Sequence, residues 1–132
     1  MTLYVLCGLP ASGKTTLSEK LAAQHNAKIF HCDEYKPHQK RKLYKEIKEA
    51  LNSSNVILDG IFLKSITRKN LLDALKEVEC KKILIRLDAS IEECIERNKE
   101  RKRPLSDNVL YHFNKKTQEP MLEEGWSEIQ HI

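Results

Sequence analysis

A run of eight residues near the start of the chain has the composition and spacing of a phosphate-binding loop. It matches the pattern G-x-x-x-x-G-K-[ST] and reads Gly8-Leu9-Pro10-Ala11-Ser12-Gly13-Lys14-Thr15. Glycine permits backbone angles that a side chain would forbid, so the N–H groups of such a loop can point inward and surround a phosphate. The helix that follows would aim its positive end at the same anion. The pattern therefore predicts binding of nucleotide phosphates.

The polar side chains of this loop have separate expected tasks. Lys14 can reach the β- and γ-phosphate oxygens of ATP, and the Thr15 hydroxyl can bind Mg²⁺. Such a site needs a carboxylate at the end of a neighbouring strand, and Asp59 follows the apolar run Val56-Ile57-Leu58. The predicted cofactors are ATP and Mg²⁺, although no motif in the sequence excludes GTP. The loop residues expected to contact ATP are Gly8, Pro10, Ala11, Ser12, Gly13, Lys14, Thr15 and Thr16.

Strand and helix patterns alternate along the whole chain. Apolar runs predict strands over 3–7, 27–31, 56–58, 82–87 and 127–132, and helical spacing predicts helices over 14–24, 66–78 and 107–117. Two further helices are expected after Pro37 and after a capping box at Ser90 and Glu93. This order predicts an α/β fold with a parallel sheet of about five strands and helices on both faces. Ligands of such sheets bind beyond the carboxyl ends of the strands, which would gather residues 8–16, 33–36 and 59 in one crevice.

Length and composition limit the class of protein. The chain has 132 residues, with 40% apolar and 32% charged residues, so we expect residues 1–132 to form one soluble globular domain. No apolar run approaches the roughly 20 residues that cross a bilayer, and the N-terminus does not resemble a signal peptide. The four cysteines form no C-x-x-C pair, which favours reduced thiols and a cytoplasmic location. His31 and Cys32 are adjacent, and we interpret them as a packed strand end instead of a zinc site.

The basic residues are concentrated in two segments. The net charge is only +4, but residues 36–48 contain six lysines and arginines against one acid, and residues 97–103 are similarly basic. Local positive charge of this kind suits an anionic ligand. The alternative for any one of these lysines is a solvated helix face.

Together, these segments resemble the small P-loop kinases related to the phage polynucleotide 5′-kinases, over nearly the whole chain. In that family the second strand ends in an Asp-acid-Tyr-basic segment, and this chain has Asp33-Glu34-Tyr35-Lys36. The resemblance implies that Asp33 is the general base for the acceptor hydroxyl, and that Tyr35 and Lys36 help to bind the acceptor. The family usually has Arg in place of Lys36, and Lys supplies charge without a bidentate fork.

Two more segments carry the resemblance, and one departs from it. Cys94–Arg101 resembles the family's lid, which ends in Arg-Asn-x-x-Arg, so the resemblance implies a basic lid over about residues 97–104. It also implies that Arg101 touches the transferring phosphate and that Arg97 or Arg103 assists at ATP. The segment 119–126 resembles the family's P-x-x-x-E-G-aromatic ending, which we interpret as structural. After Asp59 the family often has small polar residues and Asn, whereas this chain has Gly60-Ile61-Phe62-Leu63, so its acceptor side is more apolar.

The sequence therefore predicts a kinase that moves the γ-phosphate of ATP to a hydroxyl, with the 5′-hydroxyl of RNA or DNA as the favoured acceptor. A basic segment with an interleaved aromatic, Tyr44, suits a single strand. One alternative is a small-molecule kinase acting on a nucleoside, a sugar or an antibiotic. Another is an ATP-binding switch that hydrolyses slowly. The sequence leaves the choice of RNA or DNA, the oligomeric state and the order of the lid open.

Overall fold

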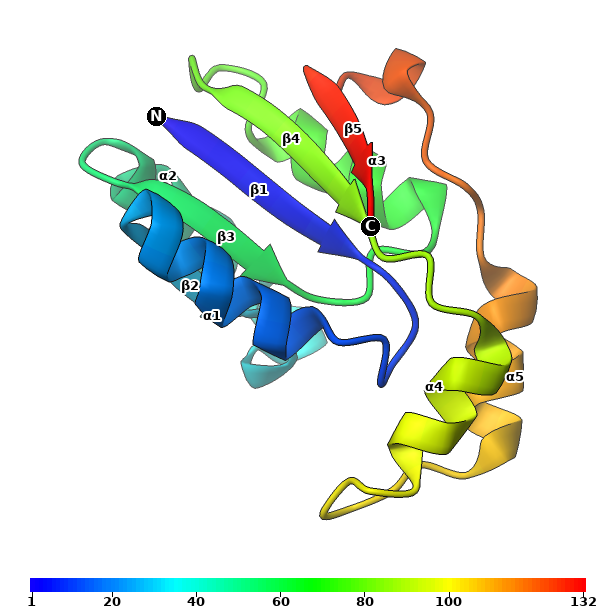
Figure 1. Cartoon of the computed structure of the whole chain (residues 1–132). Helices are drawn as coiled ribbons and strands as arrows, with labels where there is room; N and C mark the ends of the chain where they lie inside the picture. The colour runs from blue at the N-terminus through cyan, green and yellow to red at the C-terminus, as the bar shows by residue number, and fades with distance from the viewer.

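A five-stranded parallel sheet runs through the structure, which is a computed structural model describing residues 1–132. The strands are β1 (Thr2–Cys7), β2 (Ala27–His31), β3 (Asn55–Asp59), β4 (Lys81–Arg86) and β5 (Glu128–His131). Their spatial order is β2-β3-β1-β4-β5, and every neighbouring pair is parallel. All the strands therefore end at the same edge, as Figure 1 shows. The predicted parallel sheet of about five strands is confirmed.

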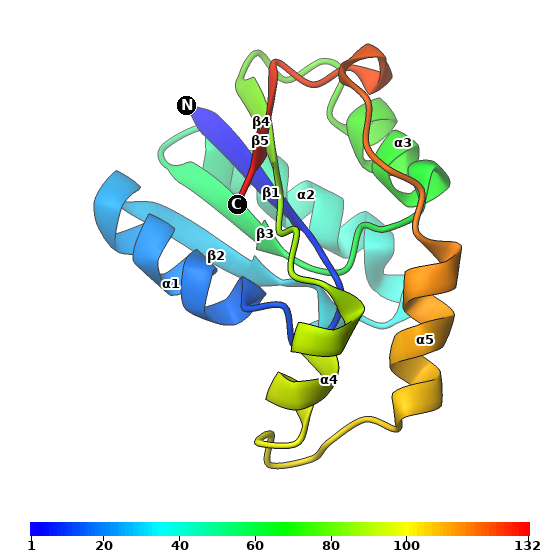
Figure 2. The same ribbon diagram turned by 45° about the vertical axis from the view of Figure 1, so that its right-hand side comes forward.

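The helices divide between the two faces and the carboxyl edge of this sheet. They are α1 (Lys14–His25), α2 (Lys40–Leu51), α3 (Ser65–Ala74), α4 (Ile91–Asn98) and α5 (Asp107–Lys116). Figures 1 and 2 show α1 on one face, α2 and α3 on the other, and α4 and α5 beyond the carboxyl ends of the strands. None of these helices has the length and hydropathy to span a membrane.

The core lies on both faces because side chains alternate along each strand. In β1, Leu3, Val5 and Cys7 belong to the larger apolar cluster, which also contains buried residues of α2 and α3. The intervening Tyr4 and Leu6 belong to a smaller cluster, against which Leu17, Leu21 and Ala22 of α1 pack. A continuous apolar run such as β1 is typical of a strand covered on both faces.

Local signals set most element boundaries within one or two residues. The capping box is present, since the Ser90 hydroxyl accepts a hydrogen bond from the Glu93 N–H at 3.1 Å. The helix predicted over 66–78 is wrong at its C-terminal end, because α3 stops at Ala74. The chain tightens there into turns, in which the Val78 N–H donates to the Leu75 carbonyl at 3.0 Å. These turns keep Leu75 fully buried while the chain reverses towards β4.

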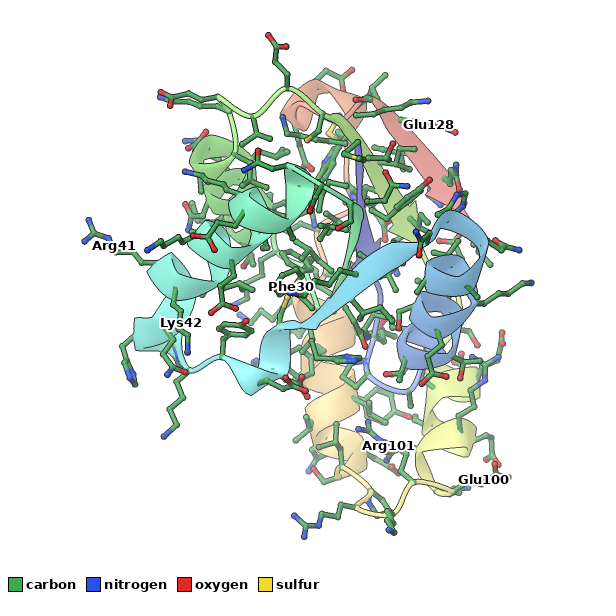
Figure 3. All side chains as sticks on the ribbon, turned by 90° about the vertical axis from the view of Figure 1, so that its left-hand side faces the viewer. Phe30, Arg41, Lys42, Glu100, Arg101 and Glu128 are labelled. Carbon is green, nitrogen blue, oxygen red and sulfur yellow. The ribbon has the colours of Figure 1, made fainter.

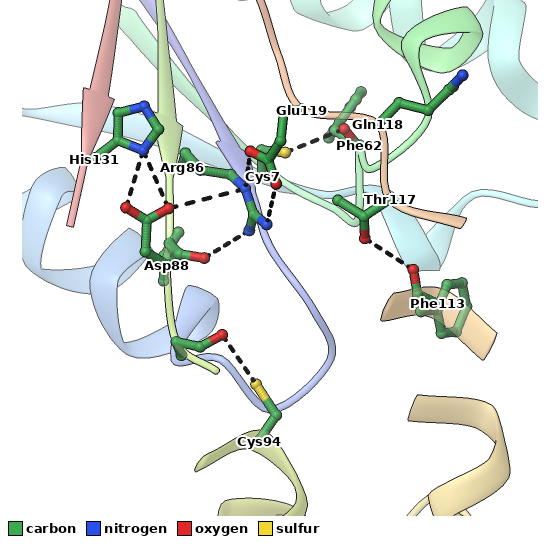
Figure 4. A network of polar contacts seen from close by, with 12 residues as sticks. Cys7, Phe62, Arg86, Asp88, Cys94, Phe113, Thr117, Gln118, Glu119 and His131 are labelled. Carbon is green, nitrogen blue, oxygen red and sulfur yellow. Dashed lines mark hydrogen bonds and ion pairs between the residues drawn. The ribbon is translucent and has the colours of Figure 1, made fainter. Parts of the chain in front are cut away.

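Two buried arginines fasten the segment that links α5 to β5. Arg68 of α3 forms a fork with Glu124, with both N···O distances at 2.9 Å, and Arg86 of β4 forms a similar fork with Glu119 at 3.0 and 3.1 Å. Figure 4 shows the second fork beside Asp88 and His131. Bidentate pairs of this kind fix geometry as well as contributing energy. The closing segment therefore holds α5 in place over the carboxyl edge, which fits the structural role expected for it.

Candidate functional site

The loop between β1 and α1 presents a set of unpaired backbone donors. The N–H groups of Ala11, Gly13, Lys14, Thr15 and Thr16 form no hydrogen bond within the protein, whereas the Ser12 N–H donates to the Leu9 carbonyl at 3.1 Å. Buried or enclosed backbone donors are rarely left without a partner. Donors gathered at a helix N-terminus form an anion site, because the helix dipole also favours negative charge there. The loop therefore fits a bound phosphate chain.

Two glycines of this loop are required for different reasons. Gly13 has φ of 99°, in the left-handed region that favours glycine. Gly8 does not have a positive φ. The expectation that both glycines are needed for backbone angles that other residues avoid is therefore wrong for Gly8. At Gly8 an added Cβ would stand 2.8 Å from the Ser12 Oγ and 3.2 Å from the Leu87 Cβ, so close packing excludes a side chain.

Two further features mark the loop as specialised. Ala11 has φ of 64°, a conformation that costs a residue with a side chain on the order of 1–3 kcal/mol. The Ser12 side chain is buried and its Oγ has no hydrogen-bond partner. A buried hydroxyl without a partner is unusual in a folded protein. Strain and unsatisfied polar groups of this kind are typical of binding sites, where a ligand supplies the missing contacts.

Lys14 turns back on its own loop. Its Nζ donates hydrogen bonds to the Gly8 carbonyl at 2.9 Å and to the Leu9 carbonyl at 2.7 Å. Burial lowers the pKa of Lys14 to about 8, against the opposite effect of the nearby Asp59 carboxylate, while Arg101 lowers the pKa further. An anion placed at the loop would offset this cost and favour the charged ammonium.

Thr15 and Asp59 come together across the carboxyl edge, as the sequence predicts. The Thr15 hydroxyl donates to Asp59 Oδ2 at 3.1 Å, and His31 Nδ1 lies 3.0 Å from the same carboxylate oxygen. Asp59 is almost fully buried. A hydroxyl and a carboxylate are the hard oxygen ligands that Mg²⁺ prefers when substrate phosphates and waters fill the remaining positions. The residues present therefore fit a bound Mg²⁺.

A cleft of about 640 Å³ extends from this loop towards α4 and α5. Pro10, Ala11, Gly13, Lys14, Thr15, Thr16 and Asp59 line it, together with Arg97 and Arg101 from the basic segment. Arg97 Nη1 donates to the Ser12 carbonyl at 2.9 Å, which fastens α4 to the phosphate loop. Arg103 does not line the cleft. The structure thus brings most of the predicted ATP residues to one cleft with Arg97 and Arg101, whereas Gly8, Ser12 and Arg103 do not line it.

A second pocket, of about 390 Å³, adjoins the first. It is mainly apolar and is lined by residues that follow β2 and β3 and by residues of α2 and α5, including Tyr44, Phe62, Leu63 and Phe113. Asp33 and Phe113 line both the cleft and the pocket, along with Gly60 and Ile61. Asp33 lies in a short 3-10 turn, Cys32–Glu34, directly after β2. The predicted general base therefore stands at the junction of a phosphate cleft and an apolar pocket.

Tyr35 and Lys36, predicted to bind the acceptor, lie differently from one another. Tyr35 lines the apolar pocket, and its hydroxyl donates to Glu46, which together with burial raises the pKa of Tyr35 to about 12. Lys36 lies at the start of the turn Pro37–Gln39, and its backbone N–H donates to the Gln39 side chain at 2.9 Å. Lys36 lines neither the cleft nor the pocket.

The apolar residues after Asp59 are held in a strained conformation. Phe62 has φ of 47°, which is rare for a bulky side chain and costs on the order of 1–3 kcal/mol. Its carbonyl accepts hydrogen bonds from Arg68 Nη1 at 2.8 Å and from the Cys7 thiol at 3.3 Å, the second of which is drawn in Figure 4. The closing segment adds a contact at Leu63, whose carbonyl accepts from the Gln118 N–H at 2.9 Å. The wall of the apolar pocket is therefore built by long-range contacts.

Sequence reasoning missed several residues of the site. His31 was interpreted as a packed strand end, yet the parallel register places it opposite Asp59, where their side chains meet. Its place as the last residue of a strand at the ligand-binding edge was a usable signal. Leu105, Val109 and Phe113 also line the cleft. No local pattern could have found them, because they depend on where α5 lies over the sheet.

The sheet order, the loop and the clefts define a P-loop fold of the kinase type, with one sheet between helical layers. Residues 24–128 match the family model described as "Chromatin associated protein KTI12". The chain therefore belongs to the KTI12 family.

Solved structures agree with this fold. Chaetomium thermophilum Kti12 in complex with ADP-AlF3 superposes with a TM-score of 0.69 and 22% identity, over 98% of this chain and 88% of that one. A fungal RNA kinase gives a TM-score of 0.77 at 19% identity, over 100% and 74% of the two chains. A gluconokinase from Sinorhizobium meliloti 1021 gives 0.72 at 16% identity, over 99% and 81%. At these identities the likeness shows the fold alone.

Proposed function

We propose that this chain is an ATP- and Mg²⁺-dependent phosphotransferase that moves the γ-phosphate to a hydroxyl group, with the 5′-hydroxyl of a nucleic acid as the acceptor. One observation carries the proposal: Asp33 lines both the phosphate cleft and the apolar pocket beside it. A carboxylate between a donor site and a second pocket is placed to take a proton from a hydroxyl held there. A module that only binds ATP needs neither the second pocket nor this carboxylate.

In the proposed mechanism, the chain positions the reactants and neutralises charge. The acceptor oxygen attacks the γ-phosphorus, its proton passes to the Asp33 carboxylate, and the bond from that phosphorus to the bridging oxygen of ADP breaks. Lys14 leaves the loop carbonyls and binds the phosphates, and Arg97 and Arg101 bind the same anion from the lid side. Thr15 and Asp59 would hold Mg²⁺, which neutralises phosphate charge when it is bound.

The nucleic-acid acceptor rests on charge as well as on the pocket. The basic segment of residues 36–48 runs into α2, whose Lys40 and Tyr44 line the pocket, and Figure 3 shows Arg41 and Lys42 extending outward from this helix. The fungal RNA kinase with the same fold and the KTI12 description, which refers to chromatin, are compatible with a nucleic-acid context. We take residues 1–132 as one kinase domain with a lid over about 97–104. The cytoplasmic location stays a prediction from the sequence.

The test is transfer of labelled γ-phosphate from ATP to 5′-hydroxyl oligonucleotides of RNA and DNA, with Asp33→Ala as the control. We expect product with the wild-type chain and none with the variant. Labelled product that persists in Asp33→Ala would contradict the assignment of the base. ATP binding without transfer to either strand would contradict the nucleic-acid acceptor.

A small-molecule kinase is the second candidate. The observation that favours it is the size of the pocket, which at about 390 Å³ is within the range of small-ligand sites. Transfer to a free nucleoside or sugar with a KM that does not respond to salt would favour this candidate, because phosphate contacts make nucleic-acid binding salt-dependent.

A further inference from the structure

The apolar pocket beside Asp33 has walls that suit a planar ring. Tyr44 from α2 and Phe113 from α5 line it, with Phe62 and the aliphatic Leu43 and Leu71. Aromatic side chains bind nucleobases by stacking, whereas a sugar offers mainly hydroxyl groups, and the surface of this pocket is mainly apolar. The pocket therefore suits an acceptor with an aromatic ring better than a bare carbohydrate.

The mouth of the same pocket carries unpaired positive charge. Lys40 of α2, Lys64 just before α3 and Lys116 of α5 line the pocket. All three are exposed, and none forms an ion pair. Lysines on the surface commonly have no partner, but here three meet around one apolar opening. A group that enters with its ring inside would leave an attached phosphate among these lysines.

The position of Asp33 relates the pocket to the reacting atom. Asp33 lines both the pocket and the phosphate cleft. A single small ligand can therefore place its ring in the pocket and its hydroxyl at Asp33. A 5′-terminal nucleoside has a base and a 5′-hydroxyl on one sugar, and its 3′ side continues into a phosphodiester. Its three parts correspond to the apolar walls, to Asp33 and to the lysines.

We propose that this pocket binds the base of the acceptor's 5′-terminal nucleotide, with Tyr44 and Phe113 as stacking walls and Lys40, Lys64 and Lys116 around the following phosphodiester. The proposal rests on the proposed function and deepens it, because it identifies the part of the acceptor that is recognised. Recognition is by the ring and not by base edges, so every base is accepted. The strained Phe62, fastened by Arg68 and Cys7, keeps the wall formed in advance.

The test compares two oligonucleotides that are identical except that one has an abasic 5′-terminal residue. Binding to the full chain is measured by fluorescence anisotropy in the presence of ADP and Mg²⁺, and transfer is measured separately with ATP. Base stacking predicts roughly fivefold to 150-fold weaker binding of the abasic end. Equal binding of the two ends overturns the proposal.

Variants of α5 supply the matched controls. Phe113→Ala should weaken binding of the intact oligonucleotide, so that the dissociation constants of the intact and the abasic oligonucleotide become nearly equal. Phe113→Leu keeps most of the apolar volume and therefore the fold, and it should have the same effect on binding. Tyr111→Ala changes an exposed aromatic on the same helix outside the pocket and should leave the ratio unchanged. Loss of binding to both ends in equal measure with Phe113→Leu would contradict a role in stacking.

The lysines are tested with the same two oligonucleotides, one intact and one abasic at its 5′ end. Lys116→Gln should weaken binding of the intact and the abasic oligonucleotide equally, because both have the first phosphodiester. Lys115→Gln alters a neighbouring residue outside the pocket and should weaken binding less. Equal effects of the two variants would overturn the placement of the phosphodiester. Binding that depends on the base without any transfer would support the pocket and contradict the proposed reaction. Equal transfer to both ends, with equal binding, would keep the reaction and overturn the pocket.

Discussion

At the scale of single residues, the phosphate loop gathers polar groups that have no hydrogen-bond partner or, like Lys14, are buried at a cost to their charge. The backbone donors of the phosphate loop, the buried Ser12 hydroxyl and the desolvated Lys14 are each costly without an anion. Asp33 differs from them, since it is exposed and lies outside the loop. In the proposed function, the loop residues therefore bind the nucleotide and Asp33 serves the acceptor.

Asp33→Asn should lower kcat and leave nucleotide affinity nearly unchanged. The amide keeps the shape of the side chain but cannot accept the proton, and general bases contribute about 100- to 10,000-fold to the rate. Steady-state transfer rates and ADP titration calorimetry measure the two quantities. Glu34→Gln is the matched control, because Glu34 is the next residue and lines neither pocket. A similar loss in both variants would count against Asp33 as the base.

Lys14→Ala should weaken ADP binding as well as stop transfer. The ammonium is placed to bind phosphate, and hydrogen bonds to charged groups contribute about 1.5–3 kcal/mol, or roughly 10- to 150-fold in affinity. Titration calorimetry with ADP and Mg²⁺ checks this, with Lys20→Ala on the outer surface of α1 as the control. Unchanged ADP affinity would contradict the proposed contact.

At the scale of elements, the arginine forks connect the fold to the site. Arg68 is fully buried and ties the Phe62 carbonyl of the pocket wall to Glu124 of the closing segment. Arg86 makes a second fork to Glu119. Both acids lie in the segment that follows α5. The two forks therefore help to hold α5, which contributes Phe113 to the pocket.

Glu124→Ala should destabilise the protein strongly at neutral pH. It leaves the buried Arg68 charge without its partner, which typically costs about 3–5 kcal/mol. Glu123→Ala, at an exposed neighbour, should cost far less. Urea unfolding of the two variants measures the difference, and similar midpoints would contradict the importance of the fork.

The ion pair between Arg68 and Glu124 also predicts that the free energy of unfolding depends on pH. Burial acts to raise the pKa of Glu124, but hydrogen bonds from Arg68 and Trp126 outweigh it and the pKa is lowered on folding. A lowered pKa gives stability that is present above the unfolded value of about 4.5 and is lost as pH falls through the folded value. The gap in unfolding free energy between wild type and Glu124→Ala should therefore shrink below about pH 4.5. A difference in unfolding free energy that stays constant down to about pH 3 would contradict the lowered pKa of Glu124.

At the scale of the whole molecule, α2 links the pocket to further basic residues, because Lys40 lines the pocket and Arg41 and Lys42 extend outward from the same helix. For a single-stranded acceptor, the logarithm of the binding constant should fall with the logarithm of salt concentration by about 0.7 for each phosphate contact. Exchanging Arg41 and Lys45 for Gln should reduce this slope, whereas Lys20→Gln on α1 should not. A slope near zero for the wild-type chain would contradict a nucleic-acid acceptor.

The sequence by itself determined the fold class and the phosphate loop. Both depend on local information, since an apolar run, a glycine-rich loop and a helix onset follow one another in the chain. The rule that parallel strands end at one edge also brought Thr15 to Asp59. These predictions required no knowledge of how distant segments pack.

Only the tertiary structure decided the pocket to which we assign the acceptor. His31 meets Asp59 because of the parallel register, and Phe113 reaches the pocket because two arginine forks hold the closing segment. Lys36 has suitable charge and spacing but lies outside both the cleft and the pocket, while Lys116, eighty positions later, lines the pocket. Contacts between residues so far apart depend on the packing of whole elements, which local pattern does not contain. The second pocket therefore appears only when the chain is folded.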